Sequence, residues 1–236
     1  MKKCFILFVL LFVCVLAVAA AEGAAPGDIL AYGRYEQDND PGNGPEPIEW
    51  LVLDVREGKA LLLSKYDLDC RLYHSDCVDV TWETCDLRAW LNGDFLSAAF
   101  TPEEQAQILL TEVDNSDAQK YADDRTTGGN NTEDRVFVLS YAEAYRYFQI
   151  EKDDSENVAS RTSPTAYAQA NDPFANTRYQ TAEGNNAGWW WLRSPDYFQY
   201  SVSIVDPTGG KYGFNVNVSR GCVRPALWID LSAAQF

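Results

Sequence analysis

Residues 189–195 read W-W-W-L-R-S-P, and residues 223–228 read V-R-P-A-L-W. Successive side chains of a strand point to opposite faces of a sheet, so at least one face of the tryptophan run must be buried. Between the two stretches, residues 200–205 and 212–218 alternate between apolar and polar side chains, and P-T-G-G at 207–210 separates them as a turn. The carboxyl third therefore predicts four strands joined by Gly and Asn turns in an antiparallel sheet, the last of them over residues 223–231.

The amino-terminal part also predicts strands. Residues 27–35 alternate, and residues 48–55 and 59–64 are apolar runs separated by R-E-G at 56–58. Two such runs with a short Gly-containing connection are typical of a β-hairpin.

The middle of the chain predicts helices. Apolar residues recur at helical spacing over 87–100. T-P-E-E at 101–104 and the pair Ser140 and Glu143 are capping boxes, which mark two further helix starts. No internal repeat, linker or second core is evident, so we expect a single α+β domain over residues 22–236.

Residues 1–21 predict a cleavable signal peptide of bacterial type. Lys2 and Lys3 precede an apolar run at 4–18 that ends in small residues with the spacing that signal peptidase cleaves. The alternatives are a membrane anchor and a lipoprotein cysteine at Cys14, but the run is shorter than the ~20 apolar residues of a spanning helix. We expect a protein that is secreted or held in the cell envelope, without membrane contact after cleavage.

The composition describes an acidic, well-packed globule. The chain is 46% hydrophobic and 13% aromatic, and its formal net charge is −16. Such a surface repels phosphate backbones, so we expect no nucleic-acid partner.

Four cysteines lie beyond the predicted signal, namely Cys70, Cys77, Cys85 and Cys222. An even number in an exported protein favours disulfides, and four cysteines allow three connectivities. A metal site that adds His74 is the alternative, but the spacing lacks the close Cys-x-x-Cys pairs of structural zinc sites. We therefore expect disulfides and no metal.

Few residues point to catalysis. The chain has one histidine, and no Gly-x-Ser-x-Gly elbow is present. Paired carboxylates could hydrolyse glycosides, but the acidic pairs at 123–124 and 153–154 lie in polar stretches that are typical of solvated surface. No catalytic residue and no cofactor are predicted.

Ordered motifs along the chain resemble a widespread prokaryotic family, the domain of unknown function 6273. The resemblance covers nearly all of the chain after the predicted signal, and it implies no particular activity. The motifs are P-I-E-W-L-V-L at 47–53 with A-L-L-L-S at 60–64, T-W-E-T-C at 81–85 with L-R-A-W-L-N at 87–92, W-W-L-R-S-P at 190–195 and V-R-P-A-L-W at 223–228.

The closing pattern is also similar, more loosely, to C-type-lectin-like domains of the formylglycine-generating-enzyme type. Those domains end with a Trp-rich strand, a variable loop region and an Arg-containing last strand, and some are targets of diversity-generating retroelements. The E-P-N and W-N-D calcium signatures of sugar-binding lectins are absent, and Cys222 has no paired catalytic cysteine near it in the sequence. The resemblance thus implies neither calcium-dependent sugar binding nor oxidase activity.

Residues 196–219, between the closing motifs, are rich in Tyr, Phe, Asn, Asp and Ser. Aromatic rings give contact area at low entropic cost, and amides and hydroxyls add hydrogen bonds, as in adaptable binding loops. One or two rings of the tryptophan run could also line a groove, the alternative being that all three are buried. The predicted ligand-binding residues are Trp190, Tyr197, Phe198, Tyr200, Tyr212, Phe214, Asn215 and Asn217.

Arg193 and Arg224 are predicted to be structural, because a buried arginine needs carboxylate or carbonyl partners. Together, these features predict an exported, non-catalytic binding domain that recognises a protein or glycan ligand through residues 196–219. The alternatives are a cell-envelope hydrolase with paired carboxylates and a structural module of a surface assembly.

Overall fold

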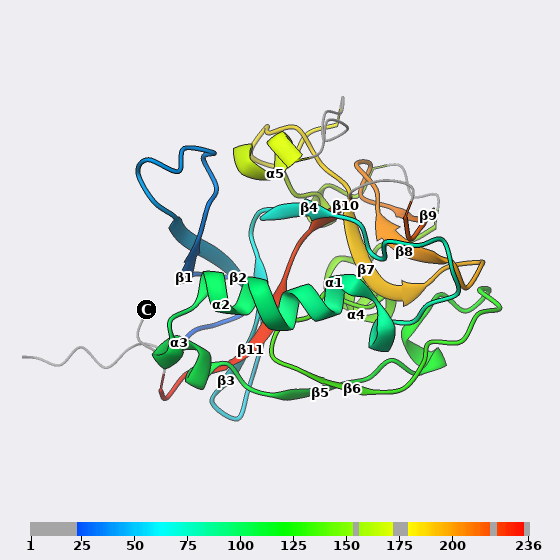
Figure 1. Cartoon of the computed structure of the whole chain (residues 1–236), viewed down its shortest axis with the longest axis horizontal. Helices are drawn as coiled ribbons and strands as arrows, with labels where there is room; N and C mark the ends of the chain where they lie inside the picture. Colours follow the sequence, from blue (N-terminus) through cyan, green and yellow to red (C-terminus); the bar gives the residue numbers. More distant parts are fainter. Residues whose placement is uncertain (1–22, 153–155, 172–178, 218–220, 234–236) are drawn as a thin grey trace, which may run out of the picture.

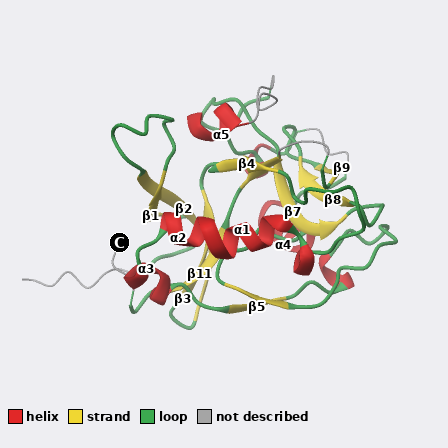
Figure 2. Cartoon of the chain, in the orientation of Figure 1, coloured by secondary structure: helices red, strands yellow, loops and turns green. Residues whose placement is uncertain are grey.

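The computed structural model describes residues 23–152, 156–171, 179–217 and 221–233, so the predicted signal peptide lies outside the described residues. The strands form a four-stranded sheet, a five-stranded sheet and a small two-stranded sheet, with short helices around them (Figures 1 and 2). The α+β prediction is confirmed. The strands are β1 (Ile29–Tyr35), β2 (Glu46–Arg56), β3 (Lys59–Ser64), β4 (Asp69–Arg71), β5 (Thr111–Val113), β6 (Thr132–Asp134), β7 (Trp190–Pro195), β8 (Ser201–Val205), β9 (Lys211–Asn215), β10 (Gly221–Val223) and β11 (Ala226–Asp230).

The four-stranded sheet has the order β1-β2-β3-β11, and all of its pairs are antiparallel. Strands β2 and β3 form the predicted hairpin. Its turn residues, Glu57 and Gly58, have φ angles of 51° and 75°. Positive φ at both central residues fits the right-handed twist of the flanking strands, and glycine adopts it without strain.

The five-stranded sheet has the order β4-β10-β7-β8-β9. Its pairs are antiparallel except β7 with β10, which is parallel and corrects the expectation of a fully antiparallel sheet. The expected last strand is also divided, because β10 belongs to this sheet and β11 to the four-stranded one. Arg224 and Pro225 lie at the crossing, where proline, which has no N–H, cannot continue a ladder.

The helical segments are short. The helix predicted over 87–100 consists of α1, the π-helical turn η2, which contains Gly93, and α2. Both predicted capping boxes are present, at the start of α3 and of α4. The helices and helical turns are η1 (Trp82–Thr84), α1 (Asp86–Trp90), η2 (Leu91–Phe95), α2 (Leu96–Ala99), α3 (Pro102–Gln107), η3 (Asp117–Gln119), α4 (Tyr141–Phe148), η4 (Val158–Ser160) and α5 (Ala166–Asn171).

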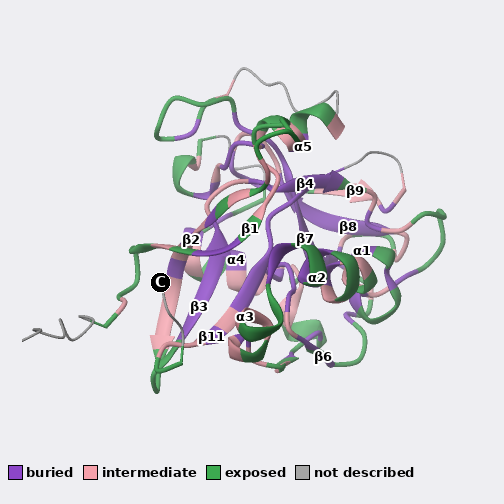
Figure 3. Ribbon diagram, turned by 60° about the vertical axis from the view of Figure 1, so that its left-hand side comes forward, coloured by how far each residue is buried: buried purple, intermediate pink, exposed green. Residues whose placement is uncertain are grey.

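The core lies along the central strands of both sheets. Strands β3, β7 and β8 are almost entirely buried (Figure 3). The largest fully buried side chains include Trp50, Trp82, Trp190 and Trp191. The closing tryptophan motif thus supplies core residues to the sheet that carries the candidate site.

Arg224 and Asp67 are both buried where the chain crosses between the sheets. The Arg224 Nε atom donates to the Ser64 carbonyl oxygen at 2.9 Å, and its guanidinium lies 5.1 Å from the centre of the Trp190 ring. Neither carboxylate oxygen of Asp67 has a hydrogen-bond partner within the described part of the chain. Burial raises the pKa of Asp67 to about 8, against the opposing effect of Arg224.

We expect the folded state to lose stability as the pH rises from 5 to 9. Folded Asp67 keeps its proton up to a pKa of about 8, whereas the unfolded side chain loses it near pH ~4. The stabilisation from this group is therefore fully present below the pKa of the unfolded state and is lost as the pH rises to the pKa of the folded state. Between the two pKa values, the free energy of unfolding falls by at most about 1.4 kcal/mol per pH unit. Urea unfolding at several pH values measures the slope.

The Asp67→Asn variant, which imitates the neutral carboxyl, should lose this dependence between pH 5 and 9. Replacement of the exposed-loop carboxylate Asp40 by asparagine serves as the control and should keep the wild-type slope. Equal slopes for the wild type and Asp67→Asn would show that Asp67 does not titrate in this range.

Candidate ligand-binding surface

The predicted binding segment presents large aromatic side chains to solvent. Tyr197, Phe198 and Tyr212 are 55%, 50% and 54% exposed. Within the described residues, Tyr145 is the one other aromatic side chain that is exposed to a similar degree. We define the aromatic surface as Tyr197, Phe198, Tyr200, Tyr212 and Phe214.

Three of these rings come from the turn between β7 and β8. The Tyr197 and Phe198 rings meet edge to face at 4.9 Å, and the Phe198 and Tyr200 rings stack at 5.2 Å with an interplanar angle of 4°. Ser201 closes the turn, because its backbone N–H donates to the Phe198 carbonyl oxygen at 2.9 Å and its hydroxyl accepts from the Phe198 N–H at 3.1 Å. These hydrogen bonds fix the backbone of the turn that carries the rings.

The other two rings come from β9, one of the two edge strands of the five-stranded sheet. Tyr212 and Phe214 are two residues apart and so lie on one face of the strand. Their ring centroids are 5.8 Å apart, and the Phe214 ring lies 5.0 Å from that of Trp189, which is buried. This row of aromatic rings connects exposed Tyr212 to the core.

Tyr197 and Tyr212 line the same pocket, which has a volume of about 240 Å³. The structure thus brings together the β7–β8 turn and strand β9. The other lining residues are Asp124, Lys152, Asp196, Lys211 and Gly213.

The pocket has a charged floor that no sequence pattern indicates. The Lys211 side chain is 3% exposed; its Nζ lies 3.0 Å from Asp124 Oδ2 and also contacts the Asp196 carboxylate. Burial raises the pKa of Asp124, and Lys211 opposes that rise. A Cβ at Gly213 would lie 1.6 Å from Asp196 Oδ2, so only glycine leaves room for this carboxylate.

The interpretation of residues 123–124 as solvated surface is wrong for Asp124, because its side chain is only 5% exposed. Burial is tolerated here because Lys211 supplies an ionic partner. The residues at 153–154, interpreted in the same way, lie outside the described part of the chain.

Trp190 does not belong to the surface, so the prediction is wrong for this residue. It is fully buried, its Nε1 donates to the Ser160 carbonyl oxygen at 3.2 Å, and its ring lies edge to face with Phe148. Strand β7 lies inside the sheet, and both of its faces are covered. Asn215 and Asn217 are half-buried at and beyond the end of β9.

Arg193 is 2% exposed and connects β7 to the start of α4. Its guanidinium donates to Glu143 Oε1 at 3.0 Å, to Asn115 Oδ1 at 3.1 Å and to the backbone carbonyl oxygens of Asp114 and Val138, each at 3.0 Å. Glu143 is also the capping-box residue of α4. These partners are all groups of the protein's own fold, as expected for an arginine with a structural role.

The cysteines fall into two groups. Cys70 and Cys222 are direct partners on β4 and β10, with their Sγ atoms 2.6 Å apart. Cys77 is an exposed thiol. Cys85 is a buried thiol that caps α1 by accepting from the Arg88 N–H, and burial raises its pKa to about 12. Within the described part of the chain neither Cys77 nor Cys85 has a neighbouring thiol, so the expected disulfides are wrong for these two and stay a prediction for Cys70 and Cys222.

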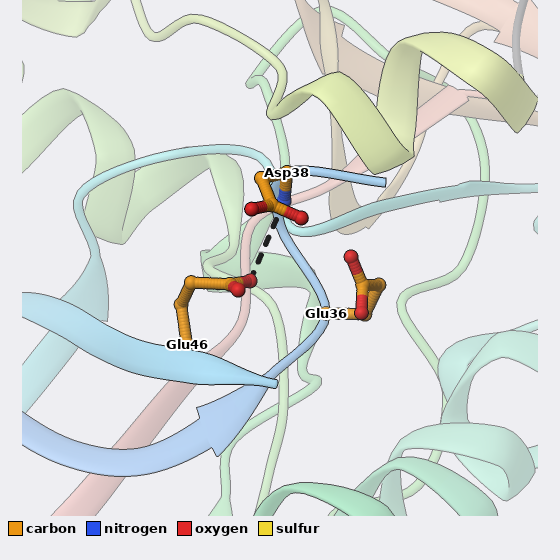
Figure 4. A group of neighbouring side chains, drawn as sticks. All are labelled: Glu36, Asp38 and Glu46. Atoms are coloured by element: carbon orange, nitrogen blue, oxygen red, sulfur yellow. Dashed lines mark hydrogen bonds between the residues drawn. The ribbon is translucent and has the colours of Figure 1, made fainter. Parts of the chain in front are cut away.

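Three carboxylates lie close together at the loop between β1 and β2. Ligand oxygens of Glu36, Asp38 and Glu46 lie within 4.8 Å of one another (Figure 4). Glu46 Oε2 accepts from the Gln37 N–H at 2.8 Å, and Asp38 Oδ2 accepts from Asn43 at 2.8 Å. One oxygen from each residue is fewer than the six to eight that Ca²⁺ takes. These carboxylates hold together the surface loop between β1 and β2, and that role accounts for their contacts.

The sequence model of the family described as "Domain of unknown function (DUF6273)" matches residues 57–231. The chain belongs to this family. The match spans β3 to β11, including both closing motifs and the aromatic surface, whereas the motif at 47–53 lies outside it. No curated protein and no solved structure matches the chain. None of the helices in the described residues is long and apolar enough to cross a bilayer.

Proposed function

We propose that this DUF6273 domain is an exported, non-catalytic binding domain of C-type-lectin-like type, which recognises a protein or glycan ligand through the aromatic surface. One observation carries the proposal: half-exposed Tyr197, from the β7–β8 turn, and half-exposed Tyr212, from strand β9, line one pocket with a buried charged floor, and the half-exposed Phe198 ring packs against Tyr197. Burial of the exposed part of each ring would contribute roughly 2 kcal/mol. Rings of this kind dominate many binding interfaces.

The size of the pocket supports a small inserted group. Its volume of about 240 Å³ is below the ~300–1,000 Å³ of pockets for drug-sized ligands. One sugar residue or one amino-acid side chain of the ligand would enter between Tyr197 and Tyr212. Polar groups of the ligand would reach the carboxylates and the ammonium group of the floor.

The same floor supports binding over hydrolysis. A carboxylate hydrolase needs one acid that can donate a proton and a second that acts as nucleophile or base. Here the Lys211 ammonium contacts both Asp124 and Asp196. Both carboxylates are thus engaged by one buried ammonium group, which leaves neither of them open to a substrate as a separate acid or nucleophile.

Export, with localisation outside the cytoplasm, is part of the proposal and rests on residues 1–21. An oxidising compartment would allow Cys70 and Cys222 to form a disulfide. Oxidation removes two protons and two electrons from the thiols, and an external disulfide accepts them by exchange.

The triple variant Tyr197→Ala, Phe198→Ala, Tyr212→Ala should lose binding at least a hundredfold, or ~2.8 kcal/mol, while the domain stays folded because the rings are half-exposed. The measurement applies wild type and variant, without residues 1–21, to a printed glycan array and an array of immobilised cell-surface proteins. Tyr145→Ala, on α4, is the matched control. Unchanged binding by the triple variant, or no binding by the wild type on either array, would reject the proposal.

A further inference from the structure

A second cavity, of about 590 Å³, shares no lining residue with the pocket of the aromatic surface. Its walls come from β4 and the residues after it, from α1 and η2, and from α5, which lies beside β4 in Figure 1. We call this cavity the helix groove. Its lining residues include Arg71, Leu72, Leu87, Trp90, Asp94 and Tyr167.

Arg71 is held in a fixed position on one wall of the helix groove. Its guanidinium lies 4.2 Å from the centre of the Trp90 ring, and its Nε is 3.4 Å from Asp69 Oδ2. Asp69 is buried and accepts hydrogen bonds from the Tyr35 hydroxyl at 2.9 Å and the Cys70 N–H at 2.7 Å. The terminal nitrogens of Arg71 have no hydrogen-bond or ion-pair partner among the described residues. An arginine held in this way presents an open fork that matches a carboxylate.

The helical wall carries an acid. Asp94 is exposed and lies in the π-helical turn η2, and its carboxylate forms no ion pair or hydrogen bond within the described ranges. Gly93, beside it, has no atom within 4 Å of the position of a Cβ, so the wall is open there. π-Helical turns are rare and often occur at functional sites. The second acid of this wall, Asp86, already accepts a hydrogen bond from the Ser75 N–H at 2.8 Å.

These charges select among ligand classes. An open guanidinium favours a carboxylate, and an open carboxylate favours an ammonium group. A purely anionic ligand would be repelled by a protein with a formal charge of −16, whereas a zwitterion carries no net charge. Trp90, Leu87 and Tyr167 add apolar atoms to the same lining.

We propose that the helix groove binds a zwitterionic amino acid with an apolar side chain, its carboxylate on Arg71 and its ammonium group on Asp94. The cavity volume lies in the ~300–1,000 Å³ range of small-molecule sites. This site is independent of the aromatic surface, so either proposal can fail alone.

Three probes test the assignment by isothermal titration calorimetry: L-phenylalanine, 2-phenylethylamine, which lacks the carboxylate, and 3-phenylpropionate, which lacks the ammonium group. Phenylalanine should bind at least tenfold more tightly than either singly charged analogue. Arg71→Gln should weaken phenylalanine binding at least tenfold and leave phenylethylamine binding unchanged. Asp94→Asn should weaken phenylalanine binding similarly and leave phenylpropionate binding no weaker.

Arg56→Gln is the matched control, because Arg56 also lies over a tryptophan, Trp228, but outside the groove. It should leave all three affinities unchanged. The proposal is overturned if phenylalanine binds no more tightly than its analogues, if no probe binds, or if Arg71→Gln weakens phenylalanine and phenylethylamine equally. Thermal unfolding of each variant distinguishes a loss of binding from a loss of fold.

Discussion

Arg193→Met is expected to lower the free energy of unfolding by about 3–5 kcal/mol, the cost of removing one partner from a buried ionic network. Arg193 is 2% exposed, and methionine offers no donor to Asn115 or to the two backbone carbonyl oxygens that the guanidinium binds. Glu143 would keep its place in the capping box of α4 but lose its ionic partner. Urea unfolding measures the loss.

Arg146→Met is the matched control. The Arg146 side chain is 61% exposed and lies 3.5 Å from Asp54, and exposed pairs contribute about 0–1 kcal/mol. If Arg193→Met does not fold, Arg193→Lys, which keeps the charge but not the fork, should fold with reduced stability. A loss of less than about 1 kcal/mol for Arg193→Met, below the range for a buried partner, would contradict the structural role of Arg193.

Formation of the Cys70–Cys222 disulfide is expected to stabilise the protein by about 5 kcal/mol in the chain-entropy treatment, because the two cysteines are 152 residues apart. The oxidised, denatured protein without residues 1–21 should then contain two titratable thiols, those of Cys77 and Cys85. Peptide mapping by mass spectrometry without reduction identifies the bond. Reduction should lower the temperature of unfolding.

Cys77→Ser is the control for the disulfide. This variant should retain the Cys70–Cys222 bond, contain one titratable thiol and unfold at the wild-type temperature, because Cys77 is exposed. Four thiols in the oxidised wild type would show that no disulfide forms. No thiols would show that Cys77 and Cys85 also pair.

Local features of the fold were predictable from the sequence. The β2–β3 turn depends on two residues with positive φ, Glu57 and Gly58, and the capping boxes depend on residues three apart. Within the segment 196–219, Tyr197, Phe198 and Tyr212 are exposed as expected, whereas strand β8 is entirely buried.

Features that depend on distant partners were not predictable in the same way. Lys211 meets Asp124 from 87 residues away, and no local pattern in the sequence connects the two. Trp190 is buried because β7 lies inside its sheet and both of its faces are covered. The alternation of residues along the strand does not reveal the position of the strand within the sheet. The division of the last strand at Pro225 likewise depends on where two separate sheets lie.

Amide hydrogen exchange of the wild type, with and without a ligand that the arrays identify, tests the central claim most directly. Binding through the aromatic surface predicts slower exchange in residues 197–200 and 211–215, with exchange in β3 and β11 unchanged. Slower exchange confined to other segments, with 197–200 and 211–215 unaffected, would contradict the claim that this domain recognises its ligand through the aromatic surface.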